Sequence, residues 1–238
     1  MEHPIHWDHI FGNLPPVFVH AVAVWVIVLL LAVLASGKLT LIPSGVQKVM
    51  EYFFDFVRGY SRDLIGPEHR TYDPLFVGIF FFIFVSNLWG IVPGMLSPTA
   101  NLNTNFSIAI VVFLATHFYG MRKQGVVPYL NQFSGPVPFW LKPFMFFIEI
   151  ISHVARPVSL SFRLFGNIVA KEILLLILAT LVLQFAGSTQ AIGQALTVFP
   201  ALLYPLLIVL GAFICFIQAF VFMLLAQVYV AGALSEHH

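Results

Sequence analysis

The sequence predicts an all-α, polytopic membrane protein with about five membrane helices. The last two helices are expected to form an overlong tilted hairpin, and an amphipathic surface helix completes the fold. Only 9% of the 238 residues are charged and 60% are hydrophobic, whereas soluble domains carry about 25% charged residues. Residues 9–37, 74–121 and 173–235 contain no Asp, Glu, Lys or Arg at all.

The N-terminal part of the chain contains one predicted span and one predicted surface helix. Residues 1–15 are polar and aromatic, and we expect them outside the membrane. Residues 17–35 are apolar apart from His20. As a helix this segment is long enough to cross a hydrocarbon core of about 30 Å. At helical spacing, residues 44–65 place apolar side chains on one face and charged side chains on the other. This pattern is typical of a helix on the membrane surface or against a soluble partner, and equally of a solvated connecting helix.

Two further spans are predicted at residues 75–92 and 105–121. The first is rich in Phe and ends at Pro93-Gly94, and the second contains His117. A loop bearing Pro and Gly then leads to Lys142.

The C-terminal half consists of two very long apolar runs. Residues 143–186 make a run of 44 residues, which as a helix would be about 66 Å long, roughly twice the hydrocarbon thickness. Residues 198–231 would span about 50 Å by the same arithmetic. Neither can stand upright as a single span. We therefore expect a break, a kink at Pro157 or a strong tilt, and a tilted hairpin overall.

The basic residues predict the orientation of the protein. The loops 36–74 and 122–142 hold five and three Lys or Arg, whereas the loops 93–103 and 187–197 hold none. Because cytoplasmic loops carry the excess of Lys and Arg, the N-terminus is expected outside and the C-terminus in the cytoplasm.

An arginine interrupts the first of the long runs. A charge at the bilayer centre costs about 3 kcal/mol on insertion scales, so it usually faces a protein interior or a water-filled path. On a helix, Glu149, Ser159 and Asn167 project within about 40° of Arg163, whereas Glu172 projects about 180° away. Glu149 and Ser159 lie on the cytoplasmic side of this stripe.

Such a stripe suits ion movement. A carboxylate or amide partway into the bilayer can hold water or relay a proton, and a fixed cation between two such regions would block direct passage. Arginine suits the barrier because it stays protonated. The alternative is that Arg163 pairs with Glu149 or Glu172 to hold a bundle together. In the last helix, small residues around Gly211 allow close helix contact, so Gln218 can face the arginine helix.

Several segments closely resemble the subunit a family of F-type ATP synthases, namely PVSLSFRLFGNIVAKEILL, ICFIQAFVFMLLAQVYVAGAL, SNLWGIVPG and SPTANLNTN. The resemblance implies a proton-conducting stator subunit that offers two offset half-channels to a ring of c subunits. It further implies subunit b of the peripheral stalk and the rest of the ATP synthase as partners. The expected location is a bacterial inner membrane, with no nucleic acid and no cofactor.

The resemblance also implies roles for individual residues. Arg163 would face the rotor carboxylate and prevent protons from passing directly between the half-channels. The external half-channel would be lined by Asn87, Asn167, Glu172 and Gln218. The cytoplasmic half-channel would be lined by Ser159 and Glu149.

One position departs from part of the family. Some members pair the residue at the Glu172 position with a titratable side chain at the position of Gly211. Glycine leaves that partner missing here, and water, His20 or His117 are the alternatives that the sequence offers.

A secondary ion transporter and a non-conducting multi-pass scaffold are the alternative functions. A transporter typically shows an inverted repeat, which this sequence lacks, and a scaffold would tolerate the loss of Arg163. The chain has no G-x-x-x-x-G-K-[ST] phosphate loop, since Gly37-Lys38 is followed by Leu39, so we expect no active site for ATP in this subunit. His3, His6 and His9 have no supporting ligand cluster, and no metal site is expected.

Overall fold

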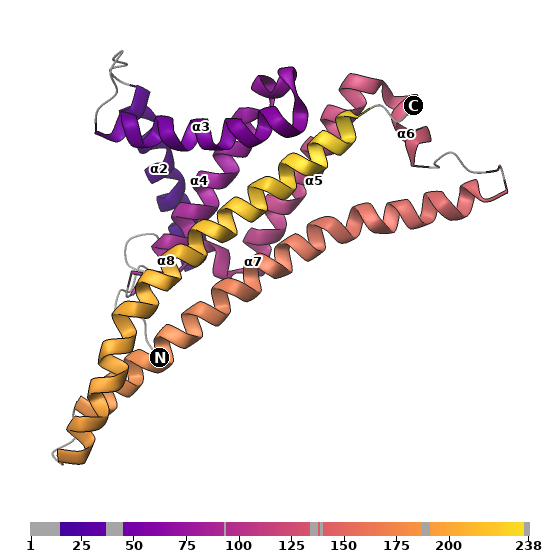
Figure 1. Ribbon diagram of the computed structural model, residues 1–238. Helices are drawn as coiled ribbons and strands as arrows, with labels where there is room; N and C mark the ends of the chain where they lie inside the picture. The colour runs from indigo at the N-terminus through magenta and orange to yellow at the C-terminus, as the bar shows by residue number, and fades with distance from the viewer. Residues whose placement is uncertain are drawn as a thin grey trace.

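The computed structural model describes residues 15–36, 45–92, 94–133, 138, 140–186 and 191–235. Nearly all of the segment expected outside the membrane, residues 1–15, therefore lies outside the described residues. Every regular element that is described is helical, which confirms the all-α class (Figure 1). In order they are α2 (Pro16–Ser36), α3 (Val46–Ile65), η1 (Pro67–Thr71), α4 (Asp73–Trp89), η2 (Pro98–Ala100), α5 (Leu102–Gln124), α6 (Val126–Gln132), α7 (Lys142–Ala186) and α8 (Ala191–Leu234).

Apolar helices of spanning length make this a multi-pass membrane protein. Within the described residues, α2, α5, α7 and α8 are long and apolar enough to cross a bilayer. Helix α4 is equally apolar but has 17 residues, or about 25 Å, slightly less than the hydrocarbon thickness.

The two long C-terminal helices are unbroken. Helix α7 has 45 residues and α8 has 44, so each is about 66 Å long and must tilt within a bilayer. Pro157 removes one backbone N–H from α7 without ending it, and the Ser161 hydroxyl donates to the Pro157 carbonyl at 2.8 Å. Figure 1 shows the pair side by side near their connection and diverging toward the other ends.

The short helix α6 occupies part of the segment that the sequence predicted as a loop. Its seven residues are too few to produce a periodic apolar pattern. Tertiary contact holds it in place, because the ring of Tyr129 packs on Gly120 of α5. A Cβ atom built at Gly120 would lie only 2.4 Å from Tyr129 Cε2, so only glycine allows this approach.

Helix α3 lies across the ends of α2 and α4 and packs against α8 (Figure 1). Polar side chains make part of this contact. Gln227 of α8 is fully buried, and its amide donates to the Val57 carbonyl at 3.2 Å and to the Ser61 hydroxyl at 2.8 Å. The surface helix is therefore fixed to the long hairpin by hydrogen bonds that water cannot easily replace.

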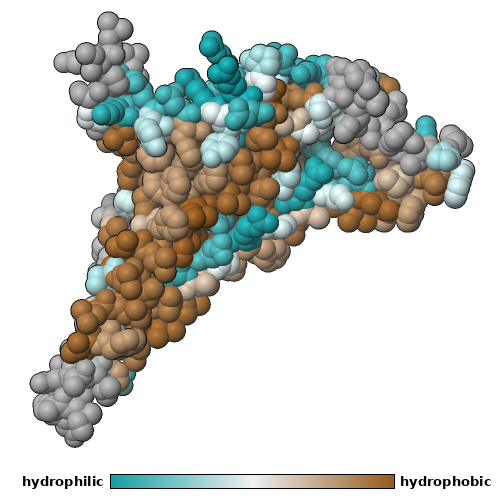
Figure 2. All heavy atoms as spheres, in the orientation of Figure 1, coloured by the Kyte–Doolittle hydropathy of each residue, from teal (hydrophilic) through white to brown (hydrophobic). Residues whose placement is uncertain are grey.

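Asp73 connects three elements at the same end of the molecule. Its buried carboxylate lies 2.9 Å from His69 Nδ1 and 3.5 Å from Arg58 Nε. Lys123 of α5 adds an ion pair with Glu68 of η1 at 3.0 Å. Charged groups thus gather at this end, and most of the remaining visible surface is hydrophobic (Figure 2).

A hydrophilic strip crosses the hydrophobic surface over the α7–α8 pair (Figure 2). Exposed polar side chains of α7 belong to this hairpin, among them Ser159, Arg163 and Asn167. A polar strip at membrane depth is costly against lipid, so it indicates a surface that meets water or another subunit.

Replacement of Gln227 tests the contact between α3 and α8. We expect Gln227→Ala to lower the free energy of unfolding by about 2 kcal/mol, because the Val57 and Ser61 groups lose their partner and a cavity forms. The measurement is thermal unfolding of the detergent-solubilised protein. Val228→Ala, at the exposed neighbouring position, is the control and should change stability little; equal losses in both variants would contradict the contact's importance.

Candidate functional site

Arg163 lies on an exposed face of α7, as does Ser159 one turn before it. Within the described part of the chain, no carboxylate comes within ion-pair distance of Arg163. The alternative in which it pairs with Glu149 or Glu172 is therefore not observed. Its guanidinium retains five N–H donors for water or for a partner outside this chain.

Asn167 links the arginine helix to α8. Its side-chain amide donates to Gln218 Oε1 at 2.7 Å. Gln218 is 5% exposed whereas Asn167 is exposed, so this hydrogen bond marks the edge of the helix contact. The structure thus brings together two predicted site residues, one helical turn from Arg163.

Glu172 leaves α7 on another side and approaches the end of α4. Its Oε1 is buried and has no hydrogen-bond partner among the described residues. A Cβ atom at Gly90 would lie 3.0 Å from that oxygen and 2.6 Å from the Ser97 Cβ. Glycine at this position therefore makes room for the carboxylate.

Lys171 is a functional candidate that we did not single out from the sequence. It is 6% exposed, and its Nζ donates to the Asn87 carbonyl at 3.0 Å and to Cys215 Sγ at 3.3 Å. A Cβ atom at Gly211 would lie 3.4 Å from Lys171 Cδ. The lysine side chain thus occupies the space beside the glycine.

The helical angle of Lys171 can be calculated from the sequence, but it does not show whether the side chain is buried. It projects about 80° from Arg163, on the same side as Asn167. Helical angles alone do not show which side of a helix is covered, and only the packing of α4 and α8 buries this amine.

Asn87 completes the polar group around the end of α4. It is fully buried, and its Oδ1 accepts a hydrogen bond from the Thr99 hydroxyl at 2.6 Å. Its Nδ2, like Glu172 Oε1, has no partner in the described chain. Buried polar atoms are nearly always satisfied by protein or water, so these two atoms leave one donor and one acceptor available to water here.

A second polar group lies toward the other end of α7. Glu149 accepts from His153 Nε2 at 3.2 Å, and the rings of His153 and His117 are 5.3 Å apart. Burial raises the pKa of the Tyr129 phenol, which Arg156 partly offsets. Since this phenol stays protonated at neutral pH, it can donate to His117 Nδ1, 2.7 Å away.

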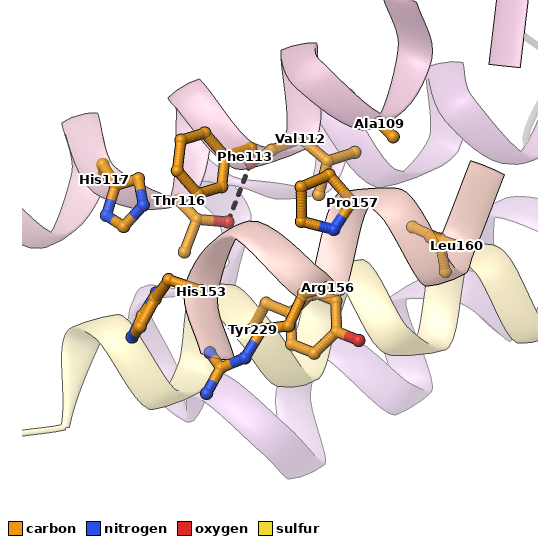
Figure 3. A pocket seen from close by; sticks show the side chains of 10 residues that line it. All are labelled: Ala109, Val112, Phe113, Thr116, His117, His153, Arg156, Pro157, Leu160 and Tyr229. Atoms are coloured by element: carbon orange, nitrogen blue, oxygen red, sulfur yellow. Dashed lines mark hydrogen bonds between the residues drawn. The ribbon is translucent and has the colours of Figure 1, made fainter. Parts of the chain in front are cut away.

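Figure 3 shows the small recess that these histidines share with Arg156, Pro157 and Leu160 of α7. The recess has room for about one water molecule. Arg156 lies 5.3 Å from the ring centre of Tyr229 on α8. Ser159 and Glu149 are thus on the same helix as Arg163, but the structure gives them no direct contact with each other.

His20 lies elsewhere. It is buried, and its Nδ1 accepts from the Trp89 indole at 3.0 Å, which joins α2 to α4. Among the residues described, no cluster of His, Cys, Asp or Glu has the composition of a metal site.

Comparison with known proteins identifies relatives along nearly the whole chain. The family model described as ATP synthase A chain matches residues 17–231. ATP synthase subunit a 2 of Syntrophotalea carbinolica is 42% identical over 224 residues, 93% of this chain and 88% of the relative. ATP synthase subunit a of Trichlorobacter lovleyi is 41% identical over 238 residues, 100% of this chain and 94% of the relative. ATP synthase subunit a of Campylobacter jejuni is 42% identical over 91% of this chain and 88% of the relative.

A larger side chain at Gly211 should disturb the lysine site. We expect Gly211→Val to lower the free energy of unfolding by about 1–3 kcal/mol, because the new methyl groups crowd the Lys171 side chain. The measurement is again thermal unfolding in detergent.

The matched control is Gly232→Val in the same helix, where a Cβ atom would meet nothing within 4 Å. The helix propensity of valine is the same at both positions. Equal stability of the two variants would show that the space at Gly211 is not required.

Proposed function

Because the chain belongs to the ATP synthase A chain family, we propose that it is the proton-conducting stator subunit of a rotary ATP synthase. One observation carries the proposal. Arg163 lies exposed on an overlong helical hairpin, without an ion-pair partner in the described chain, and polar groups lie on either side of it along α7.

Arg163 acts on a carboxylate that a second subunit brings past it. A guanidinium close to a carboxylate favours the ionised form, so the proton leaves as the carboxylate reaches the arginine. The same fixed charge repels protons and cations that would cross directly between the two half-channels. Since its guanidinium is always protonated, this barrier does not depend on pH.

The external half-channel runs through the polar group at the end of α4. Asn87, Asn167, Glu172 and Gln218 supply amide and carboxylate groups there, and the unpartnered atoms of Asn87 and Glu172 support ordered water between helices. A proton can move along water that is held by such groups.

Lys171 takes the place of the titratable partner that Gly211 lacks. Its buried amine is adjacent to Glu172 in sequence and contacts the Asn87 carbonyl. The three atoms nearest to a Cβ placed at Gly211 belong to Lys171 and Ile91, and neither His20 nor His117 is among them. We therefore assign the lysine, with water, to the external path.

The cytoplasmic half-channel includes Ser159 and Glu149. Ser159 is exposed one turn from Arg163, and Glu149 is half-buried and paired with His153. Both lie toward the N-terminal end of α7, opposite in direction to Glu172.

The proposed partners follow from the exposed surfaces. Exposed apolar residues of α8, including Leu206, Phe213 and Ile217, offer a surface for the ring of c subunits beside the arginine. Subunit b and the remaining ATP synthase subunits are further partners. The chain lies in a bacterial inner membrane with its N-terminus outside, consistent with its basic loops.

The energetics require repeated proton transfer. One charge that crosses the membrane potential is worth about 2.3 kcal/mol per 100 mV, so several protons contribute to each ATP. This subunit holds the path, and ATP is made elsewhere in the complex.

Loss of the arginine should abolish coupling without loss of assembly. We expect Arg163→Ala to eliminate ATP-driven proton pumping in membrane vesicles, because nothing then favours loss of the proton from the rotor carboxylate. Assembly should persist because the side chain is exposed and has no ion pair to lose within the described residues. Arg122→Ala, at an exposed position at the end of α5, is the control; coupled pumping by Arg163→Ala would refute the mechanism.

The external path predicts coupling between Glu172 and Lys171. We expect Glu172→Gln and Lys171→Met each to slow pumping about threefold or more, because each removes a titratable group from the path. The double variant should be slowed by less than the product of the single effects, since both residues serve one path. Pumping and ATP hydrolysis are measured together in vesicles.

Lys123→Met controls for loss of a lysine, because Lys123 is partly exposed and paired with Glu68. Unchanged rates in Glu172→Gln would remove that residue from the path. Independent, multiplicative effects would place Lys171 outside it.

A further inference from the structure

Two histidines meet on the cytoplasmic side of Arg163. His117 comes from α5 and His153 from α7, and their ring centres are 5.3 Å apart with an angle of 38° between the rings. Both are partly exposed. The mechanism above uses neither ring.

Each imidazole has its own polar partner. His117 Nδ1 lies 2.7 Å from the Tyr129 hydroxyl, and His153 Nε2 lies 3.2 Å from Glu149 Oε1. Each ring therefore uses one nitrogen for a partner. In the described chain the opposite nitrogens, His117 Nε2 and His153 Nδ1, remain for exchange with water or with each other.

The surroundings limit the charge that the pair can hold. Glu149 faces it from α7 and favours a proton, whereas Arg156 on the same helix disfavours one. Tyr129 faces it from α6, and Tyr229 of α8 lines the recess with Arg156 (Figure 3). Because the two rings lie close to each other and to a guanidinium, both are not readily in the charged imidazolium form at the same time.

The recess runs along α7 from His153 to Leu160, three residues before Arg163. Leu160, one helical turn before Leu164, lines its far side, and the space holds about one water molecule (Figure 3). The pair thus lies between the charged end of the molecule and the arginine. Imidazole is the side chain that gains and loses a proton near neutral pH.

We propose that His117 and His153 are a proton-exchange pair of the cytoplasmic half-channel, an inference that rests on the stator function proposed above. His153 takes a proton at Nδ1, from water or from the Nε2–H of His117, and forms an imidazolium. When His117 gives its proton, the Tyr129 hydroxyl passes one to His117 Nδ1 and takes another from water. Loss of a proton from the other nitrogen of His153, to Glu149 or to water, restores the neutral ring, so no charge accumulates. The pair connects cytoplasmic water to the Glu149 and Ser159 side of α7.

The test uses the whole ATP synthase in inverted membrane vesicles, in which the medium sets the cytoplasmic pH. His117→Gln, His153→Gln and the double variant retain polar side chains that cannot carry a proton. We expect the double variant to pump at least about fivefold more slowly at pH 7 and to lose the pH dependence of the wild type between about pH 6 and 8. The single variants should show smaller effects in the same direction.

Phe113→Leu is the packing control, because the Phe113 ring lies 4.2 Å from the His117 ring centre. It alters the contact and keeps both imidazoles, so its pH profile should match that of the wild type. ATP hydrolysis in each sample corrects for the amount of assembled enzyme. If the double variant does not assemble, the pumping rates and pH profiles of the two single variants are compared with those of Phe113→Leu instead.

Two results would overturn the inference. A double variant with the rate and pH profile of Phe113→Leu would show that the rings do not exchange protons. The same flattened profile in Phe113→Leu would assign the effect to packing. Neither result would touch the stator function, which fails only if Arg163→Ala still pumps.

Discussion

The rest of the structure depends on one charged side chain, Arg163, that has no ion-pair partner among the described residues. It lies on an exposed face of α7, and a guanidinium at membrane depth costs several kcal/mol unless water or a counter-charge meets it. A protein that retained such a group for stability alone would pair it internally. A carboxylate on another subunit would explain the exposed position, because the guanidinium would then have a counter-charge whenever the two subunits are in contact.

The long hairpin makes that exposure possible. Helices α7 and α8 extend well beyond the thickness of a bilayer, so they must cross it at a strong tilt and present a long continuous surface. The other helices pack on one side of this pair and leave the arginine face uncovered. Polar groups on either side of the arginine lie at different depths along α7, as two offset half-channels require.

Glycines provide the space in which the polar groups pack. At three places a Cβ atom would meet a side chain that the proposed proton paths use or contact, too closely at Gly90 and Gly120 and at an ordinary contact distance of 3.4 Å at Gly211. Without a Cβ the neighbouring helix approaches closely enough to bury the titratable group. The pairs are Gly90 with Glu172, Gly211 with Lys171, and Gly120 with Tyr129.

The end of the molecule that α3 covers is built differently. Gln227 and Asp73 hold α3 to the bundle through buried hydrogen bonds and ion pairs. These contacts are remote from Arg163 and keep the surrounding helices in fixed positions. A rigid scaffold of this kind is needed because a fixed charge acts only where its position is maintained.

Sequence alone determined the membrane class, the long hairpin and the stripe that carries Arg163, because apolar run length and helical angles depend on local order in the chain. It also supplied Asn167 and Gln218, which the structure joins directly. Tertiary structure alone decided that Lys171 is buried beside Gly211, and that His117 meets His153 across two helices. Which side of a helix is covered depends on partners far away in the chain, and periodicity contains no information about them.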